Sequence, residues 1–100
     1  MTSMFTVSAM SYGLVIDERS PEPSYQQLAR QIRERILDGR LPAPDAAGGA
    51  LPSISQLVGE TGLAVNTVRR AVAVLAEEGY VVIVPGRGTY VARKSLAFGT

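Results

Sequence analysis

The sequence predicts a mostly α-helical domain that ends in a small β-hairpin, and three observations lead to this prediction. Three stretches place apolar residues three and four positions apart, which is the period of an amphipathic helix. Two β-branched runs, at residues 80–84 and 89–92, flank a Pro-Gly-Arg-Gly turn. The chain has 100 residues, of which 46% are hydrophobic and 19% charged, so it has room for one globular domain.

The first helix is predicted at residues 24–38. Ser24 and Gln27 have the spacing of a capping box, and Gly39 is suited to end the helix. Before it, residues 1–23 form a lead-in in which Leu14, Val15 and Ile16 predict a short strand ahead of a Pro-rich turn. Three arginines lie between the apolar positions of this helix and are expected on a solvated face paired with Glu34 and Asp38: Arg30, Arg33 and Arg35.

The second and third helices follow a Pro-, Gly- and Ala-rich segment at residues 41–52, which predicts a surface loop. Ser53 and Gln56 form a second capping box, so a short helix is expected at about residues 53–60, closed by Gly62. A third helix is predicted at residues 65–78. Its apolar stripe, which we expect in the core, consists of Val68, Ala71, Val72 and Leu75.

The order of these elements predicts a winged helix-turn-helix. Two helices joined by a tight turn form a helix-turn-helix, whose second helix fits the major groove of DNA. A polar outward face is expected on that helix at Asn66, Thr67, Arg69 and Arg70. At the hairpin tip, Gly86 and Gly88 would let the backbone approach a minor groove, where Arg87 supplies positive charge. The pattern therefore indicates duplex DNA as the partner.

Composition excludes most other chemistry. The chain has no cysteine and no histidine, so no disulfide, thiolate, cofactor or metal site is expected, and with Lys94 near the tail as its one lysine we expect no enzyme. The first residues lack the basic start of a secretory signal, and no apolar run is long enough to span a membrane. We therefore expect a cytoplasmic protein. The net charge of +1 permits an anionic partner without requiring one.

Residues 25–92 resemble the DNA-binding domain of GntR-family bacterial transcriptional regulators. Each motif is short, but together they keep the family's order and are specific. The matching motifs are Tyr25-x-Gln27-Leu28-Ala29, Ile32-Arg33, Ile36-x-x-Gly39-x-Leu41, Leu51-Pro52-Ser53, Gly62-x-x-x-Asn66-Thr67-Val68-Arg69-x-Ala71, Leu75, Glu78-Gly79 and Gly86-x-Gly88-Thr89-Tyr90-Val91.

The resemblance implies a repressor or activator that binds operators as a homodimer. For this chain we expect a palindromic operator. By position, the family's contacts in the recognition helix fall on Asn66, Thr67 and Arg69, and its wing contacts fall on Arg87 and Gly88. We expect the recognition helix, residues 65–78, in the major groove and the wing tip, residues 86–89, at the minor groove. The predicted DNA-binding residues are Ser53, Asn66, Thr67, Arg69, Arg70, Arg87, Gly88 and Thr89.

The chain departs from the family pattern at several positions. Ser55 stands where the family commonly has an arginine, and Ala64-Val65 stands where a serine-arginine or asparagine-proline pair commonly opens the recognition helix. The segment between Leu41 and Leu51 is also about four residues longer than the pattern. Residues 93–100 form a tail that is too short for an effector domain, so we expect a stand-alone member or the N-terminal part of a longer protein with an unknown effector. An alternative function is therefore a winged-helix module for protein interaction or dimerisation.

Dimerisation has one preferred candidate surface in the sequence. Family members usually dimerise through the effector domain, which leaves the lead-in, the Pro-Gly loop and the tail as candidates here. We favour the lead-in, because an apolar strand before the first helix would pair either with the wing hairpin or with a neighbour's sheet edge. Its apolar residues are Phe5, Val7, Leu14, Val15 and Ile16.

Overall fold

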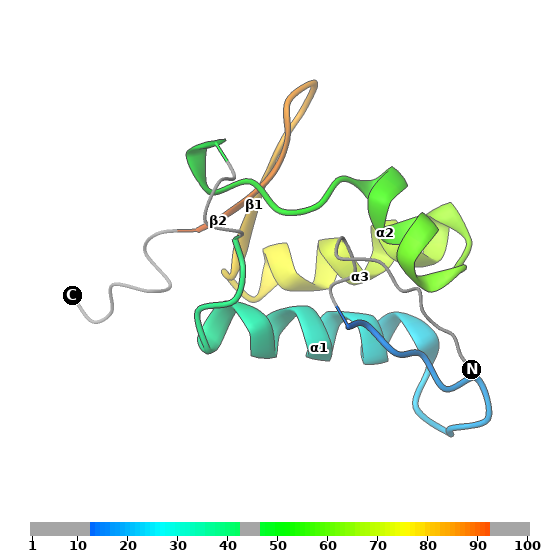
Figure 1. The fold of residues 1–100 in the computed structure, drawn as a ribbon. Helices are drawn as coiled ribbons and strands as arrows, with labels where there is room; N and C mark the ends of the chain where they lie inside the picture. The colour runs from blue at the N-terminus through cyan, green and yellow to red at the C-terminus, as the bar shows by residue number, and fades with distance from the viewer. Residues whose placement is uncertain (1–12, 43–46, 93–100) are drawn as a thin grey trace, which may run out of the picture.

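The computed structural model describes residues 13–42 and 47–92, in which three α-helices precede a two-stranded antiparallel hairpin (Figure 1). The predicted fold class, mostly α with a small β-hairpin, is confirmed, and each helix lies within a few residues of its expected bounds. The elements are α1 at Ser24–Leu37, the 3₁₀ turn η2 at Ala47–Gly49, α2 at Ile54–Thr61, α3 at Val65–Glu77, β1 at Val81–Val84 and β2 at Gly88–Val91.

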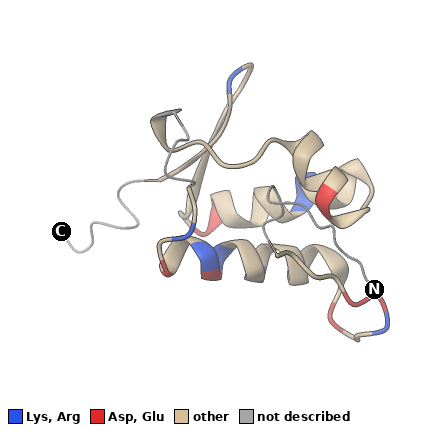
Figure 2. Cartoon of the chain, in the orientation of Figure 1, with Lys and Arg blue, Asp and Glu red and all other residues tan. Residues whose placement is uncertain are grey.

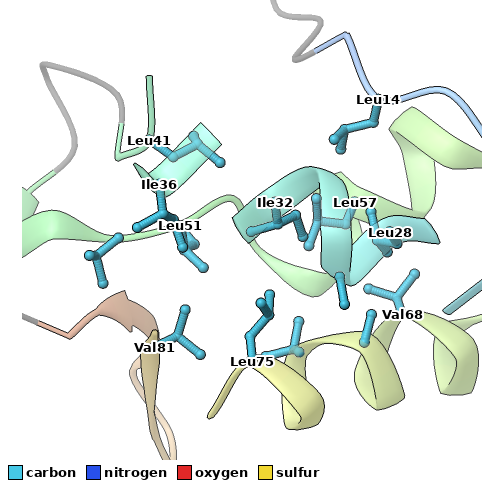
Figure 3. Packing of buried hydrophobic residues seen from close by; sticks show 14 of the residues in the cluster. Leu14, Leu28, Ile32, Ile36, Leu41, Leu51, Leu57, Val68, Leu75 and Val81 are labelled. Atoms are coloured by element: carbon cyan, nitrogen blue, oxygen red, sulfur yellow. The ribbon is translucent and has the colours of Figure 1, made fainter. Parts of the chain in front are cut away.

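The core lies between α1 and α3, which run side by side, and α2 closes one end of it (Figures 1 and 3). The stripe predicted for α3 is buried in full, with Val68 and Leu75 at 0% exposure. Leu28 and Ile32 of α1 and Leu57 of α2 are also almost fully buried. Burial of such side chains stabilises a fold by about 1.5–3 kcal/mol each, so these stripes hold the three helices together.

The start of α1 differs from the prediction. Pro23, not Ser24, is the N-cap residue, and no side chain caps this helix end. The expected capping box does not form because the side chain of Gln27 is buried at 3% exposure and bonds elsewhere. Its amide accepts from the backbone N–H of Asp17 at 2.8 Å and donates to the carbonyl oxygens of Asp17 and Glu22, both at 2.8 Å.

Two buried glutamines hold the lead-in against α1, so the predicted strand at residues 14–16 is wrong. Gln31 accepts from the backbone N–H of Val15 at 2.9 Å and donates to the carbonyl oxygen of Val15 at 2.6 Å. With Gln27 bonded to Asp17 in the same way, side-chain amides replace the partner strand that the segment would otherwise need. Leu14 enters the core at 9% exposure, while Phe5 and Val7 lie outside the described residues.

Ionic contacts lie on the outer face of α1. Of the two predicted acidic partners, Glu34 lies 3.9 Å from Arg30, whereas Asp38 pairs with Arg40. Arg30 lies 2.9 Å from Glu22, and hydrogen bonding to this guanidinium lowers the pKa of the Glu22 carboxyl. Arg33 lies 2.9 Å from Glu78, just beyond α3. These pairs connect α1 to the turn before it and to the end of α3.

The last part of the predicted surface loop is packed against the hairpin. Ala50 forms a β-bridge with Tyr90, and the N–H of Leu51 donates to the carbonyl oxygen of Thr89 at 2.8 Å. Leu51 and Pro52 are buried. The loop prediction is therefore wrong for these residues, because the edge of β2 supplies backbone partners that the local sequence does not reveal.

The hairpin is closed by a tight turn. Val81 pairs with Val91 and Val84 with Gly88, and the N–H of Arg87 donates to the carbonyl oxygen of Val84 at 2.9 Å. Gly86 has φ +76°, in the left-handed region that glycine favours. The Pro-Gly sequence in the middle of this turn therefore matches the backbone it must adopt.

In the described ranges, no helix combines the length and apolar character that a membrane span requires. The same ranges contain no group of three or more acidic side chains arranged to hold a metal ion.

Candidate nucleic-acid interface

The turn between α2 and α3 is fixed by well-defined helix ends. At the start of α2, Ser53 accepts from the N–H of Gln56 at 3.0 Å, and the side chain of Gln56 accepts from the N–H of Ser53 at 2.8 Å, so the predicted capping box is confirmed. At its end, Gly62 adopts φ +74° and its N–H donates to Val58. The turn is thus short and rigid, as a helix-turn-helix requires.

The exposed face of α3 carries the polar residues that the sequence analysis singled out. Asn66, Arg69 and Arg70 are exposed, and Thr67 is half-buried. On the opposite side the apolar stripe anchors the helix in the core, which orients the polar face outward.

Arg69 lies beside the hairpin and the start of α2. It lines a hollow of about 250 Å³ together with Ile54, Val72, Ile83 and Thr89. The structure thus brings together two of the predicted residues, Arg69 and Thr89. Ile54 lines the same hollow and directly follows Ser53, so the capped start of α2 lies next to them.

Arg70 leans to the opposite flank of α3. Its guanidinium carbon lies 4.0 Å from the centre of the Tyr25 ring in α1, and one guanidinium nitrogen lies 3.4 Å from the Tyr25 hydroxyl. A cation over an aromatic face is attracted by the ring. The two neighbouring arginines therefore face different sides of the helix, and Arg70 is held in place by α1.

The wing tip stands apart from the helices, at the end of the hairpin (Figure 1). Arg87 and Gly88 are exposed there. Gly88 has φ +132°, and a Cβ added to it would meet nothing within 4 Å. The backbone conformation of the turn therefore favours glycine at both tip positions. The lack of a side chain would also let the backbone approach the minor groove closely, as the sequence predicts.

The hairpin and most of the recognition helix carry no acidic side chain, and the nearest acids along the chain are Glu60 in α2 and Glu77 at the end of α3. Between Thr61 and Ala76 and between Gly79 and Ala92, the sequence contains Arg69, Arg70 and Arg87 but no aspartate or glutamate. In Figure 2 the hairpin tip is blue, whereas the red acidic positions lie on α2, at the end of α3, on the C-terminal part of α1 and on the turn that precedes α1. This side of the molecule is suited to an anionic partner.

Sequence reasoning missed several residues that position the interface. Tyr25, which stacks on Arg70, was named only within the family motif, and the contact joins residues 45 positions apart. Ile54 and Ile83, which flank Arg69, carried no recognisable signal either.

A helix-turn-helix with a polar recognition helix, followed by a hairpin with a basic tip, defines a winged helix-turn-helix DNA-binding domain. Comparison with known proteins identifies its family. The model of bacterial regulatory proteins of the gntR family matches residues 24–91. The chain therefore belongs to the GntR family, as the sequence motifs indicated.

Individual relatives support this assignment. The HTH-type transcriptional regulator Rv0792c of Mycobacterium tuberculosis is 40% identical over 74 residues, which are 74% of this chain and 26% of that protein. The GntR-family transcription factor YtrA from Sulfolobus acidocaldarius superposes with a TM-score of 0.69 at 37% identity, covering 81% of both chains. The DNA-binding domain of AraR, solved in complex with operator ORE1, gives a TM-score of 0.64 at 26% identity, covering 77% of this chain and 89% of that one.

All three relatives are transcription factors, which confirms the predicted class of a DNA-binding transcription regulator. None of the three is described as an enzyme. The chain spans between about a quarter and three fifths of the length of three curated relatives, with 26%, 32% and 58% coverage. The similarity therefore concerns the DNA-binding domain and not the remaining parts of those proteins.

Proposed function

We propose that this chain binds double-stranded DNA sequence-specifically and regulates transcription, with α3 in the major groove. The observation that carries the proposal is the exposed polar face of α3, which lies beside the hairpin and carries the basic side chains of Arg69 and Arg70. Asn66 and Thr67 lie in the first turn of α3, the part of a recognition helix that contacts base edges. Arg69 follows on the same exposed side and is able to bind a guanine edge with two hydrogen bonds.

Arg70 has a different role in this proposal. Because its guanidinium is stacked on Tyr25, it is held toward α1 and away from the hairpin side of α3. We assign it to a phosphate at the edge of the groove, where it fixes the orientation of α3 without reading sequence. Ser53, at the capped start of α2, is assigned to the sugar-phosphate backbone as well.

The wing is assigned to the adjacent minor groove. Arg87 projects from the exposed tip, and Gly88 has no side chain to hold the backbone away from the groove wall. Thr89 lies between the tip and the hollow beside Arg69, so it links the two contact regions. A narrow minor groove has an enhanced negative potential, which favours an inserted arginine.

A homodimer on a palindromic operator completes the proposal. One recognition helix covers only a few base pairs, so specific binding requires two copies on half-sites about 34–36 Å apart. The AraR domain, bound to an operator in its crystal structure, supports the DNA-binding part of this proposal. We place the protein in the cytoplasm, where it would reach chromosomal DNA and respond to an unidentified effector.

The alternative function is that of a winged helix that serves protein interaction. It is favoured by apolar side chains exposed on the hairpin, where Val82 is 49% and Ile83 48% exposed.

A binding experiment separates DNA binding from this alternative. The full chain is used to select duplexes from a random library, and affinity for the selected and random duplexes is measured between about 50 and 200 mM salt. With four to six phosphates neutralised per monomer, log K should fall with a slope of about −4 to −5 per monomer. No enriched sequence and no salt dependence would favour the alternative.

A further inference from the structure

The first residue of α3 is an exposed valine. Val65 is 44% exposed, although valine has a lower helix propensity than most polar residues that could occupy the position. It precedes Arg69 by four residues, so the two side chains share one face of the helix. Arg69 lines the hollow with Ile83 and Thr89, so this face points to the hairpin side of α3. Val65 therefore presents an apolar side chain within the proposed interface.

The major groove offers one apolar group to such a side chain. Among the four bases only thymine displays a methyl group there, and aliphatic side chains recognise it by direct contact. A valine has no hydrogen bond to offer, so it discriminates between bases only through this methyl group. Its neighbour Asn66, also exposed, is able to bind adenine with two hydrogen bonds, which favours an A·T-containing segment at the same place.

We infer that Val65 determines specificity by contacting the 5-methyl group of a thymine in each half-site. The inference rests on the proposed function, since it assigns one base contact within the interface described above. It also states how the departure from the family pattern at Ala64-Val65 would change base recognition. Where an arginine would read guanine, this chain reads a thymine methyl group.

Deoxyuridine tests the contact directly, because it differs from thymidine only in lacking the methyl group. Each thymine of the selected operator is replaced in turn by deoxyuridine, and binding of the full chain is measured by fluorescence anisotropy. At one position per half-site we expect affinity to fall about fourfold, the loss of one buried methyl-sized group. The Val65→Ala variant has a shorter side chain, so its affinities for the thymine and deoxyuridine duplexes should differ less at that position than those of the wild-type protein. A cytosine placed there should regain affinity when it is methylated at C5.

Two further variants control the experiment. Val15→Ala alters a valine that is 71% exposed in the lead-in, so it should retain the full deoxyuridine effect. Val65→Arg should exchange the thymine preference for guanine at the same position. Thermal melting of each variant verifies that the domain is folded, which is expected for changes at exposed positions.

Failure of this inference is distinguishable from failure of the proposed function. If wild-type protein binds its selected operator specifically but no single deoxyuridine changes affinity, or if Val65→Ala retains the same sensitivity, Val65 does not read a methyl group. If no sequence is enriched by the selection, the proposed function fails and this inference fails with it.

Discussion

Arg69 and Arg70 are consecutive in the sequence, but their surroundings differ. Arg69 borders the hollow beside Ile83 and Thr89, whereas Arg70 stacks on Tyr25 at 4.0 Å. The sequence predicted both as equivalent groove residues, because helical periodicity shows which side is exposed but not which neighbour covers each flank. This geometry separates a base-reading arginine from an orienting one, and binding measurements can distinguish these roles.

Arg69→Ala should reduce affinity for the selected operator by about 1–3 kcal/mol and relax preference at one base position, because it removes a two-bond contact to a base edge. Repeating the selection with the variant measures both effects. Arg40→Ala is the matched control, since Arg40 is exposed and lies 2.8 Å from Asp38 beyond the end of α1. An unchanged base preference for Arg69→Ala would exclude Arg69 from base recognition.

Arg70→Ala should weaken binding by a similar factor on every duplex and lower the salt slope by about one unit, the signature of a lost phosphate contact. Affinities for selected and random duplexes at several salt concentrations provide the measurement. Tyr25→Leu, which removes the stacking partner but leaves the charge, should show a smaller loss in the same direction. A change of base preference with an unchanged salt slope would contradict the phosphate assignment.

Among the elements, the helices were predictable and their connections were not. The apolar stripe of α3 follows a helical period, so its burial could be read directly from Val68 to Leu75. By contrast, Gln27 and Gln31 are polar, and their partners Asp17 and Val15 lie 10 and 16 residues away. Local patterns cannot show that a side-chain amide replaces a neighbouring strand. The same limit applies to Leu51, whose partner Thr89 belongs to β2.

Gln27→Leu should lower the free energy of unfolding by about 1–3 kcal/mol, because it removes the side-chain partner of the part-buried N–H of Asp17 and carbonyl oxygen of Glu22. Urea denaturation of the full chain measures the change. Gln26→Leu, one residue earlier on the exposed face, should change stability by less than about 0.5 kcal/mol. Equal stability of the two variants would show that the amide clamp contributes nothing.

In the wing, charge and backbone conformation can be tested separately. Arg87→Ala should lower DNA affinity without changing the melting temperature, since its side chain is exposed. Gly88→Ala should lower both, because φ +132° strains any residue with a Cβ, at a cost of about 1–3 kcal/mol. Anisotropy and thermal melting of both variants provide the comparison. A reduced melting temperature for Arg87→Ala, or an unchanged one for Gly88→Ala, would contradict this division.

For the whole molecule, the structure restricts where two copies can meet. Leu14 is buried in the core and Ile16 packs against it, so of the described apolar lead-in residues Val15, at 71% exposure, is the one available to a partner. The lead-in prediction is thus weakened, because the segment that it relied on is used within the chain. DNA itself remains a means of bringing two copies together on adjacent half-sites.

The full chain should sediment mainly as a monomer when free and as two copies per duplex on a palindromic operator, because the described lead-in leaves little apolar surface for a stable free dimer. Sedimentation velocity with and without operator measures this stoichiometry. A duplex carrying a single half-site serves as the control and should bind one copy more weakly. One copy bound to the full palindrome would contradict the dimer proposal.

The central claim, sequence-specific recognition of duplex DNA, is tested most directly by the ratio of two affinities. The full chain is titrated with its selected operator and with a shuffled duplex of the same composition, at one physiological salt concentration. We predict a ratio of at least about 10³, typical of specific over non-specific binding. A ratio near one would show that the arginines of this face bind phosphate alone, and would contradict the account.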